Sequence, residues 1–163
     1  MTREEPPLII DVETSGFGAM SYPIEVGLAM SDGYKFCTLI MPAPDWTDWD
    51  DEAEKVHRVP RDVLETYGKP LQEVAEKLNQ LLEGKTVYTE GWGVDKPWLT
   101  TLFNTAGVEM KFDVASLEMI LSAPQKARWH ETRDKVLQEM NPERHRASYD
   151  ALIVQETFKR TLE

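Results

Sequence analysis

Cysteine is almost absent from this sequence, since Cys37 is the single thiol among 163 residues. One cysteine excludes an intrachain disulfide and fits a reducing compartment. Long apolar runs are missing as well, because no stretch approaches the ~20 residues that a membrane helix needs. The first residues, MTREEPP, also lack the apolar core of a signal peptide. We therefore expect a cytoplasmic protein that does not enter a membrane.

Basic residues are scarce too. Lys and Arg total 18 against 29 Asp and Glu, which gives a formal net charge of −11. This balance argues against a protein that coats long nucleic acid, where Lys and Arg supply the affinity. The acids are concentrated, because residues 45–54 hold six of them and no Lys or Arg. A small local site or metal ions can still bind phosphate on such a surface.

The order of apolar patterns indicates the fold class. Strand-like runs predict strands and apolar residues at helical spacing predict helices. The expected strands are 8–13, 22–30, 34–41, 85–93 and 110–117. The expected helices are 60–67, 70–84, 95–107, 124–140 and 148–162, with Ser148 as the N-cap of the last. A hairpin followed by alternating helices and strands is typical of an α/β domain with a mixed sheet. The length favours one domain over residues 1–163.

Two acids, Asp11 and Glu13, stand in the first apolar run. Residues two apart on a strand point to the same face, so the two carboxylates converge. Like charges side by side repel unless they share a proton or a cation. One interpretation is a strand that ends early, with both acids in solvent. The other is a hard divalent metal held by carboxylate oxygens.

Three later residues bear on this choice, although each has an ordinary structural explanation. Asp95 stands near the start of an expected helix, where Asp is a common N-cap. Asp150 lies in the first turn of the last helix, where the helix dipole favours an acid. His145 precedes Asp150 by five residues, and from a loop before that helix it can face the same cleft. The order D-x-E, then Asp, then H-x-x-x-x-D is far more specific than any of its parts.

In this order the motifs resemble the DEDDh 3′–5′ exonuclease family, which includes the proofreading epsilon subunit of a bacterial DNA polymerase, ribonuclease T and oligoribonuclease. The segment DVETSGFG is similar to the first family motif, TEGWGVDKPWLTTLF takes the place of the second, and HRASYDALIVQETFKRTL takes the place of the third. The segment KVHRVPRDVL resembles the mid-chain histidine segment of the family. Val94-Asp95 stands where the family often has Phe-Asp. The resemblance covers nearly the whole chain.

The resemblance implies a ribonuclease-H-like fold, which is a mixed five-stranded sheet flanked by helices. It also implies two divalent ions, Mg²⁺ or Mn²⁺, at the carboxylates. By this analogy Asp11 bridges both ions, Glu13 and Asp150 help to hold the first, and Asp95 supports the second through water. His145 would be the general base that takes a proton from the attacking water. The implied activity is hydrolysis of single-stranded DNA or RNA from the 3′ end, with release of 5′-mononucleotides.

The resemblance also suggests substrate contacts. They would come from Thr14, Ser15, Gly16, Phe17, Trp92, His57 and Arg146. Phe17 and Trp92 can stack on bases, although an aromatic packed at the edge of the core is an equally simple interpretation. Arg146 can contact phosphate or can simply be solvated.

Two alternatives stay open. One is an oligoribonuclease-like enzyme that acts on very short RNA, and the other is a non-catalytic interaction subunit that keeps the fold of a nuclease. The intact set of four acids and one histidine argues against the second. The expected partners are single-stranded 3′ ends or short oligonucleotides, and the family analogy allows a homodimer.

Overall fold

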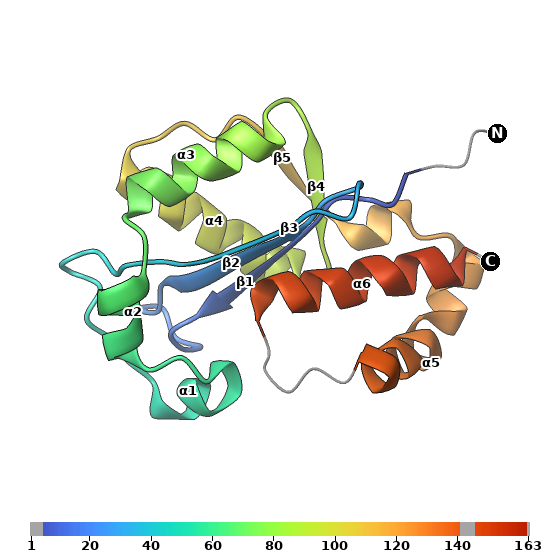
Figure 1. Ribbon diagram of the computed structural model, residues 1–163, viewed down its shortest axis with the longest axis horizontal. Helices are drawn as coiled ribbons and strands as arrows, with labels where there is room; N and C mark the ends of the chain where they lie inside the picture. The colour runs from blue at the N-terminus through green and yellow to red at the C-terminus, as the bar shows by residue number, and fades with distance from the viewer. Residues whose placement is uncertain (1–4, 141–145, 163) are drawn as a thin grey trace.

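A five-stranded sheet forms the centre of the computed structural model, which describes residues 5–140 and 146–162 (Figure 1). The strand order is β3-β2-β1-β4-β5. The first three strands pair antiparallel, and β4 and β5 run parallel to β1. The strands are β1 (Ile9–Thr14), β2 (Pro23–Ala29), β3 (Lys35–Leu39), β4 (Thr86–Thr89) and β5 (Asp113–Ser116). The mixed sheet expected from the sequence is confirmed.

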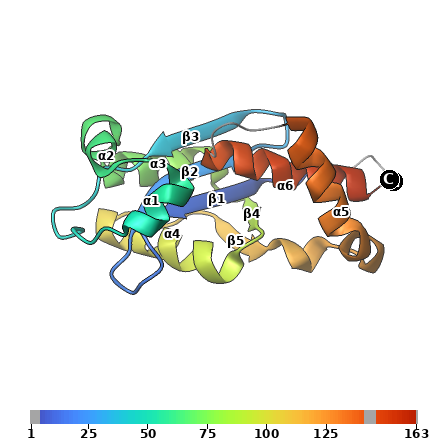
Figure 2. The same ribbon diagram turned by 90° about the horizontal axis from the view of Figure 1, so that it is seen from below.

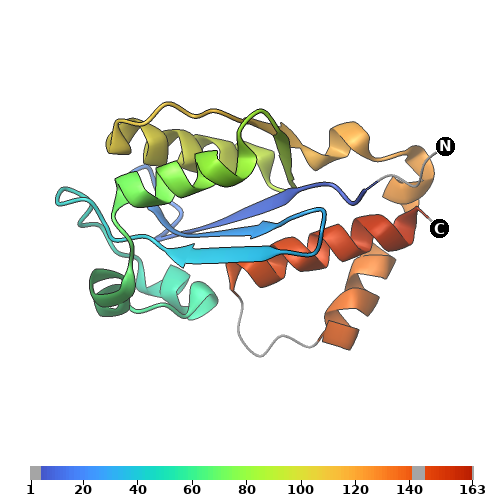
Figure 3. The ribbon, with the colours of Figure 1, turned by 45° about the horizontal axis from the view of Figure 1, so that its top comes forward.

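Helices cover both faces of this sheet. They are α1 (Asp51–His57), α2 (Arg61–Tyr67), α3 (Leu71–Leu82), α4 (Trp92–Ala106), the 3₁₀ turn η1 (Leu117–Ile120), α5 (Ala123–Met140) and α6 (Ala147–Thr161). Helices α3 and α4 lie on one face, and α6 crosses the other face with α5 packed beside it (Figures 1 and 3). Seen from below, α6 runs along β1 and β2 while α1 lies near the end of β1 (Figure 2). None of the helices in the described part of the chain combines the length and apolarity that crossing a membrane requires.

The alternation of side chains along β1 explains where its acids point. Ile10 and Val12 belong to the core between the sheet and helices α3 and α4. Ile9 instead packs with residues of α6 on the opposite face. Because Asp11 and Glu13 share the face of Ile9, both acids lie on the α6 side of the sheet.

The start of α6 is fixed against β2. Glu25 is 1% exposed and accepts a hydrogen bond from the backbone N–H of Ala147 (2.8 Å), which satisfies one of the free N–H groups at the helix start. The guanidinium of Arg146 donates to the other oxygen of Glu25 at 2.6 Å. At Gly27 a Cβ atom would lie 2.0 Å from the backbone nitrogen of Ser148, so the strand and helix can approach this closely only with glycine there. These contacts place the first turn of α6, and with it Asp150, beside β1.

Two boundaries differ from the expectation. The N-cap of α6 is Arg146 and Ser148 lies inside the helix, so the prediction that Ser148 caps it is wrong. The fourth strand ends at Thr89, and α4 already begins at Trp92 despite Gly91 and Gly93. The reason is local, because the N–H of Asp95 donates to the carbonyl of Gly91 (2.8 Å) and closes the first helical turn early.

Candidate metal centre

Three carboxylates from the two ends of the chain meet at the contact between β1 and α6. Asp11, Glu13 and Asp150 each offer one oxygen, and these oxygens all lie within 4.8 Å of one another. All three residues are half-buried. Carboxylate oxygens gathered in this way are the ligands that hard divalent cations prefer.

One oxygen of this group, the buried Oδ2 atom of Asp11, has no hydrogen-bond partner among the described residues. A buried polar atom without a partner is costly, and an ionised one is more so. A divalent cation bound by these oxygens would remove that cost, so the donor set fits the metal that the resemblance implies.

The electrostatics of the group are those of acids kept from water and close to each other. Burial, followed by the charges of Glu13, Asp95 and Asp150, raises the pKa of Asp11 well above its usual value. Burial and the charge of Asp150 raise the pKa of Glu13 from 4.5 to about 7. Without a cation, part of the cluster is therefore protonated at neutral pH.

The fourth acid, Asp95, lies in the first turn of α4 and is 6% exposed. It is not an N-cap, because that position is Gly91. The hydroxyl of Thr89 donates to its Oδ2 atom at 2.5 Å, which fixes the carboxylate at the end of β4. Burial raises the pKa of Asp95 to about 6 in spite of that hydrogen bond. Asp95 lines a cleft of about 440 Å³ together with Asp11 and Asp150, so the structure brings the four predicted acids to one place.

The other predicted residues have more varied positions. Phe17 is 79% exposed and Trp92 is 46% exposed, with its indole N–H donating to the carbonyl of Val114 (3.1 Å). The hydroxyl of Thr14 donates to the carbonyl of Gly16 (2.8 Å) in the turn after β1.

Ser15 and Gly16 are both buried in that turn. Ser15 accepts a hydrogen bond from the backbone N–H of Tyr22 (3.0 Å). A Cβ atom on Gly16 would lie 2.9 Å from the Cβ atom of Asp50, so this turn packs tightly against the residue that caps α1. The direct role of these residues toward a substrate stays a prediction.

Of the two predicted histidines, only His57 lies within the described residues. His57 is 4% exposed, packs edge-to-face on Trp49 and accepts a hydrogen bond at Nδ1 from the N–H of Val59 (3.0 Å). Burial lowers its pKa, so the ring is neutral at neutral pH. His145 lies outside the described residues, and its role stays a prediction. Arg146 forms an ion pair with the buried carboxylate of Glu25, and its side chain is 47% exposed.

Sequence reasoning missed several residues around the centre. Glu25 carries the same signal as Asp11, because it is an acid inside an apolar strand. Thr89 is an ordinary strand residue in the sequence, and only the fold shows that it supports Asp95. Arg133 of α5 lines the carboxylate cleft, and no pattern in the neighbouring sequence predicts that it lies there.

The comparisons with known proteins bear on the fold. No protein-family model matches the chain, and no curated protein sequence matches it either. Solved structures do match. A complex of E. coli Exonuclease I with a 5cy-dT13 oligonucleotide gives a TM-score of 0.67 at 13% identity, over 95% of this chain and 40% of that chain. The ribonuclease-H-like fold is confirmed.

Two further structures agree. Another structure of exonuclease I gives a TM-score of 0.64 at 13% identity, over 93% of this chain and 38% of that chain. The zinc-ion-bound form of an E. coli ExoI–ssDNA complex gives 0.59 at 13% identity, over 78% of this chain and 30% of that chain. This chain therefore spans well under half the length of the exonuclease I chains that it matches.

A prediction about stability follows from the raised pKa values. Glu13 and Asp95 keep their protons in the folded state at pH values where the unfolded chain has lost them, so unfolding releases protons. The contribution of these two groups to the stability of the metal-free protein therefore falls as pH rises from about 4 to about 7. In chelator, we expect Glu13→Gln to melt with the wild type at about pH 4.5 and clearly above it at about pH 8.

Thermal melts of both proteins in chelator across this pH range make the measurement. The difference between the two melting temperatures cancels the titration of the many surface acids. A difference that does not grow with pH would contradict the raised pKa of Glu13.

Proposed function

We propose that this chain is a metal-dependent 3′–5′ exonuclease that acts on single-stranded nucleic acid and releases 5′-mononucleotides. The observation that carries the proposal is the meeting of Asp11, Glu13 and Asp150, with oxygens within 4.8 Å and a buried orphan oxygen among them. The fold gives further support, because the matched exonuclease I structures include complexes with dA16 and 5cy-dT13 oligonucleotides.

The acids would hold the metal. Asp11, Glu13 and Asp150 would be direct ligands, and Asp95 would support a second ion from the first turn of α4. Bound Mg²⁺ or Mn²⁺ would stabilise the charge that develops on the attacking and leaving oxygens of a phosphodiester.

His145 would supply the base. It takes a proton from the water that attacks phosphorus, and the 3′ oxygen of the preceding nucleotide leaves. A neutral imidazole suits this role because its pKa lies near ~6.5. The exposed rings of Phe17 and Trp92 offer faces on which bases can stack, and stacking of this kind tolerates any sequence.

The direct test uses matched DNA and RNA oligonucleotides that carry a label at the 5′ end. With Mg²⁺ or Mn²⁺ we expect each labelled strand that is a substrate to shorten one nucleotide at a time, with 5′-mononucleotides as the product. With chelator we expect no shortening. Products of intermediate length that appear before the one-nucleotide steps would indicate internal cuts. Early release of the label as a mononucleotide would indicate degradation from the 5′ end. Either result would contradict a 3′–5′ exonuclease.

The same ladders decide between the alternatives. An oligoribonuclease-like enzyme would degrade RNA of a few nucleotides and leave long strands intact. A non-catalytic interaction subunit would leave every strand intact with either metal.

A further inference from the structure

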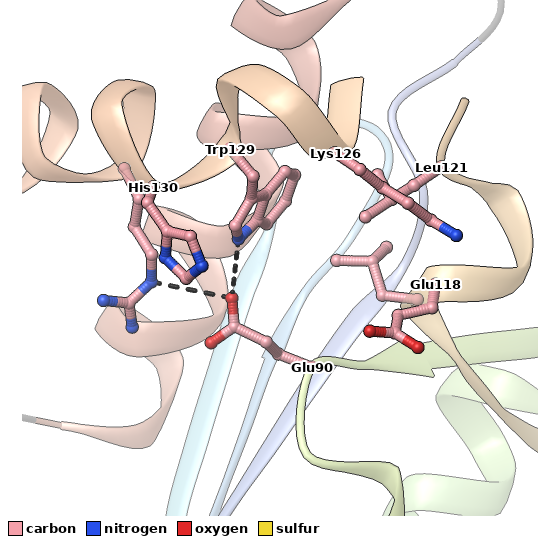
Figure 4. Close-up of a pocket in the computed structure, with 8 residues that line it drawn as sticks. Glu90, Glu118, Leu121, Lys126, Trp129 and His130 are labelled. Carbon is pink, nitrogen blue, oxygen red and sulfur yellow. Dashed lines mark hydrogen bonds and ion pairs between the residues drawn. The ribbon is translucent and has the colours of Figure 1, made fainter. Parts of the chain in front are cut away.

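A second cleft of about 480 Å³ adjoins the candidate metal centre (Figure 4). It lies between α5 on one side and the end of β4 and the turn η1 on the other. Its charged and aromatic lining consists of Glu90, Glu118, Lys126, Trp129, His130 and Arg133. Nothing in the function proposed above uses this cleft.

The basic side chains of the cleft come from one face of α5. Lys126, His130 and Arg133 are spaced four and three residues apart, and residues at this spacing share a face of a helix. In a chain with a net charge of −11, a basic face directed into a cleft is a local exception. Glu90 and Glu118 line the other side of the cleft, so the basic residues are gathered on its α5 wall, where they can contact a phosphate.

Arg133 and Glu90 connect the two clefts, because both residues line each of them. Among the described residues that line the carboxylate cleft, Arg133 alone is basic. A strand whose scissile phosphate lies beside the four acids would therefore meet, within this cleft lining, a basic side chain only at Arg133. The side chain is 35% exposed, so a ligand in either cleft can reach it.

Within the described chain, Arg133 forms only a long ion pair with Glu90. Its Nε atom lies 3.6 Å from the Oε2 atom of Glu90, and this buried Nε atom has no hydrogen-bond partner among the described residues. The same Glu90 oxygen accepts a hydrogen bond from the indole N–H of Trp129 at 3.0 Å (Figure 4). Trp129 thus holds the carboxylate near the Nε atom of Arg133, and the terminal nitrogens of Arg133 make no hydrogen bond to another described residue, so they can bind a better acceptor. A phosphate is such an acceptor, because it can take two parallel hydrogen bonds from one guanidinium.

We propose that Arg133 binds the phosphate on the 5′ side of the scissile one, and that Glu90 occupies Arg133 when no strand is bound. This inference rests on the proposed function. A strand that ends in a 3′-hydroxyl has no phosphate beyond the scissile one on its 3′ side, so a second phosphate must lie on the 5′ side. The cleft along α5 then carries the strand away from the metal centre past His130 and Lys126.

Two dinucleotide substrates separate this role from any other. A dinucleotide with a free 5′-hydroxyl holds only the scissile phosphate, whereas its 5′-phosphorylated form holds the second phosphate as well. We expect Arg133→Ala to raise the KM of the 5′-phosphorylated dinucleotide about tenfold or more and to leave the KM of the other nearly unchanged. Arg133→Lys keeps the charge but loses the paired donors of the guanidinium. Its KM for the 5′-phosphorylated dinucleotide should therefore lie between those of the wild type and Arg133→Ala.

Glu90 gives the matching test. Glu90→Gln removes the competing carboxylate, so we expect it to lower the KM of the 5′-phosphorylated dinucleotide. In the Arg133→Ala background the same change should have no effect on that KM, because the group that Glu90 competes for is gone. A pair that is only structural would instead couple in melting temperature and leave both KM values alone.

Binding without catalysis supplies an independent readout. In chelator, fluorescence anisotropy of a labelled single strand measures affinity as a function of salt. One phosphate contact contributes about 0.7 to the slope of log K against log salt on single strands, so Arg133→Ala should reduce the slope by about that much. Lys135→Ala is the matched control, since Lys135 lies on the same helix and forms an exposed ion pair with Glu131 (3.5 Å).

The outcomes are distinct. If the wild type cleaves strands but Arg133→Ala keeps the preference for the 5′-phosphorylated dinucleotide, this inference is overturned and the proposed function stands. If Arg133→Ala only relieves inhibition by free 5′-mononucleotide, the cleft holds the product and the inference is overturned as well. A wild type that neither binds nor cleaves any strand would instead overturn the proposed function.

Discussion

Asp11→Asn is expected to lower the cleavage rate by about 10³-fold or more and to raise the melting temperature of the metal-free protein. The loss of rate follows because Asp11 is one of the carboxylates that would hold the metal, and bound metal would stabilise the transition state by several powers of ten in rate. The gain in stability follows because an amide carries no charge to bury beside Glu13, Asp95 and Asp150, the three acids that help to raise the pKa of Asp11.

The metal response connects the two effects. Mg²⁺ or Mn²⁺ should raise the melting temperature of the wild type, because a ligand that binds only the folded state stabilises it. Asp11→Asn should lose most of this response. Asp113→Asn is the matched control, because Asp113 also stands on a strand but is exposed and lies outside the cluster. An unchanged metal response in Asp11→Asn would show that the cluster is not the metal site.

The second large effect is expected at His145. A general base typically contributes about 10²–10⁴-fold to a rate, so His145→Ala should lose turnover by a factor in this range. The metal-induced rise in melting temperature should persist, because the proposed metal ligands are the carboxylates. The limb of the pH–rate profile that reports an imidazole should disappear.

His57→Ala is the comparison for this variant. His57 is buried against Trp49, so its removal should lower the melting temperature through lost packing. Its loss of turnover, measured well below the melting temperature, should be much smaller than that of His145→Ala. If His57→Ala is the crippled variant and His145→Ala cleaves normally, the base must be sought in the segment around α1.

The sequence predicted the parts of the site that follow from local periodicity. The two-residue spacing of Asp11 and Glu13 on a strand was enough to predict that their side chains converge, and the structure places both on the α6 face. The first-turn position of Asp150 was equally visible, because helix α6 is amphipathic and its start could be located to within a residue or two. That Asp150 meets Asp11 and Glu13 was predicted from the family resemblance and not from local periodicity.

The remaining parts depend on contacts that no local pattern encodes. Thr89 contacts Asp95 because β4 ends at Thr89 and α4 begins at Trp92, whereas the sequence predicted a strand that continued to residue 93. Arg133 reaches the cleft because α5 packs on α6 and faces Glu90, the residue that follows β4. Glu25 was the one residue with a visible signal, since a buried acid in an apolar strand needs a partner, and that partner proved to be the start of α6.

The anchoring of α6 on β2 also sets the order in which the site comes into being during protein synthesis. The hydrogen bond from Ala147 to Glu25 joins residues 122 apart in the chain. A chain leaves the ribosome N-terminus first, so β1 and β2 exist well before Asp150 has been made. Until residues 147–161 have emerged and docked, Asp11 and Glu13 lack the third carboxylate of the cluster. Until α6 docks, the nascent chain therefore carries two of the three carboxylates of the candidate metal centre, and the repulsion of both by Asp150 arises only at that step.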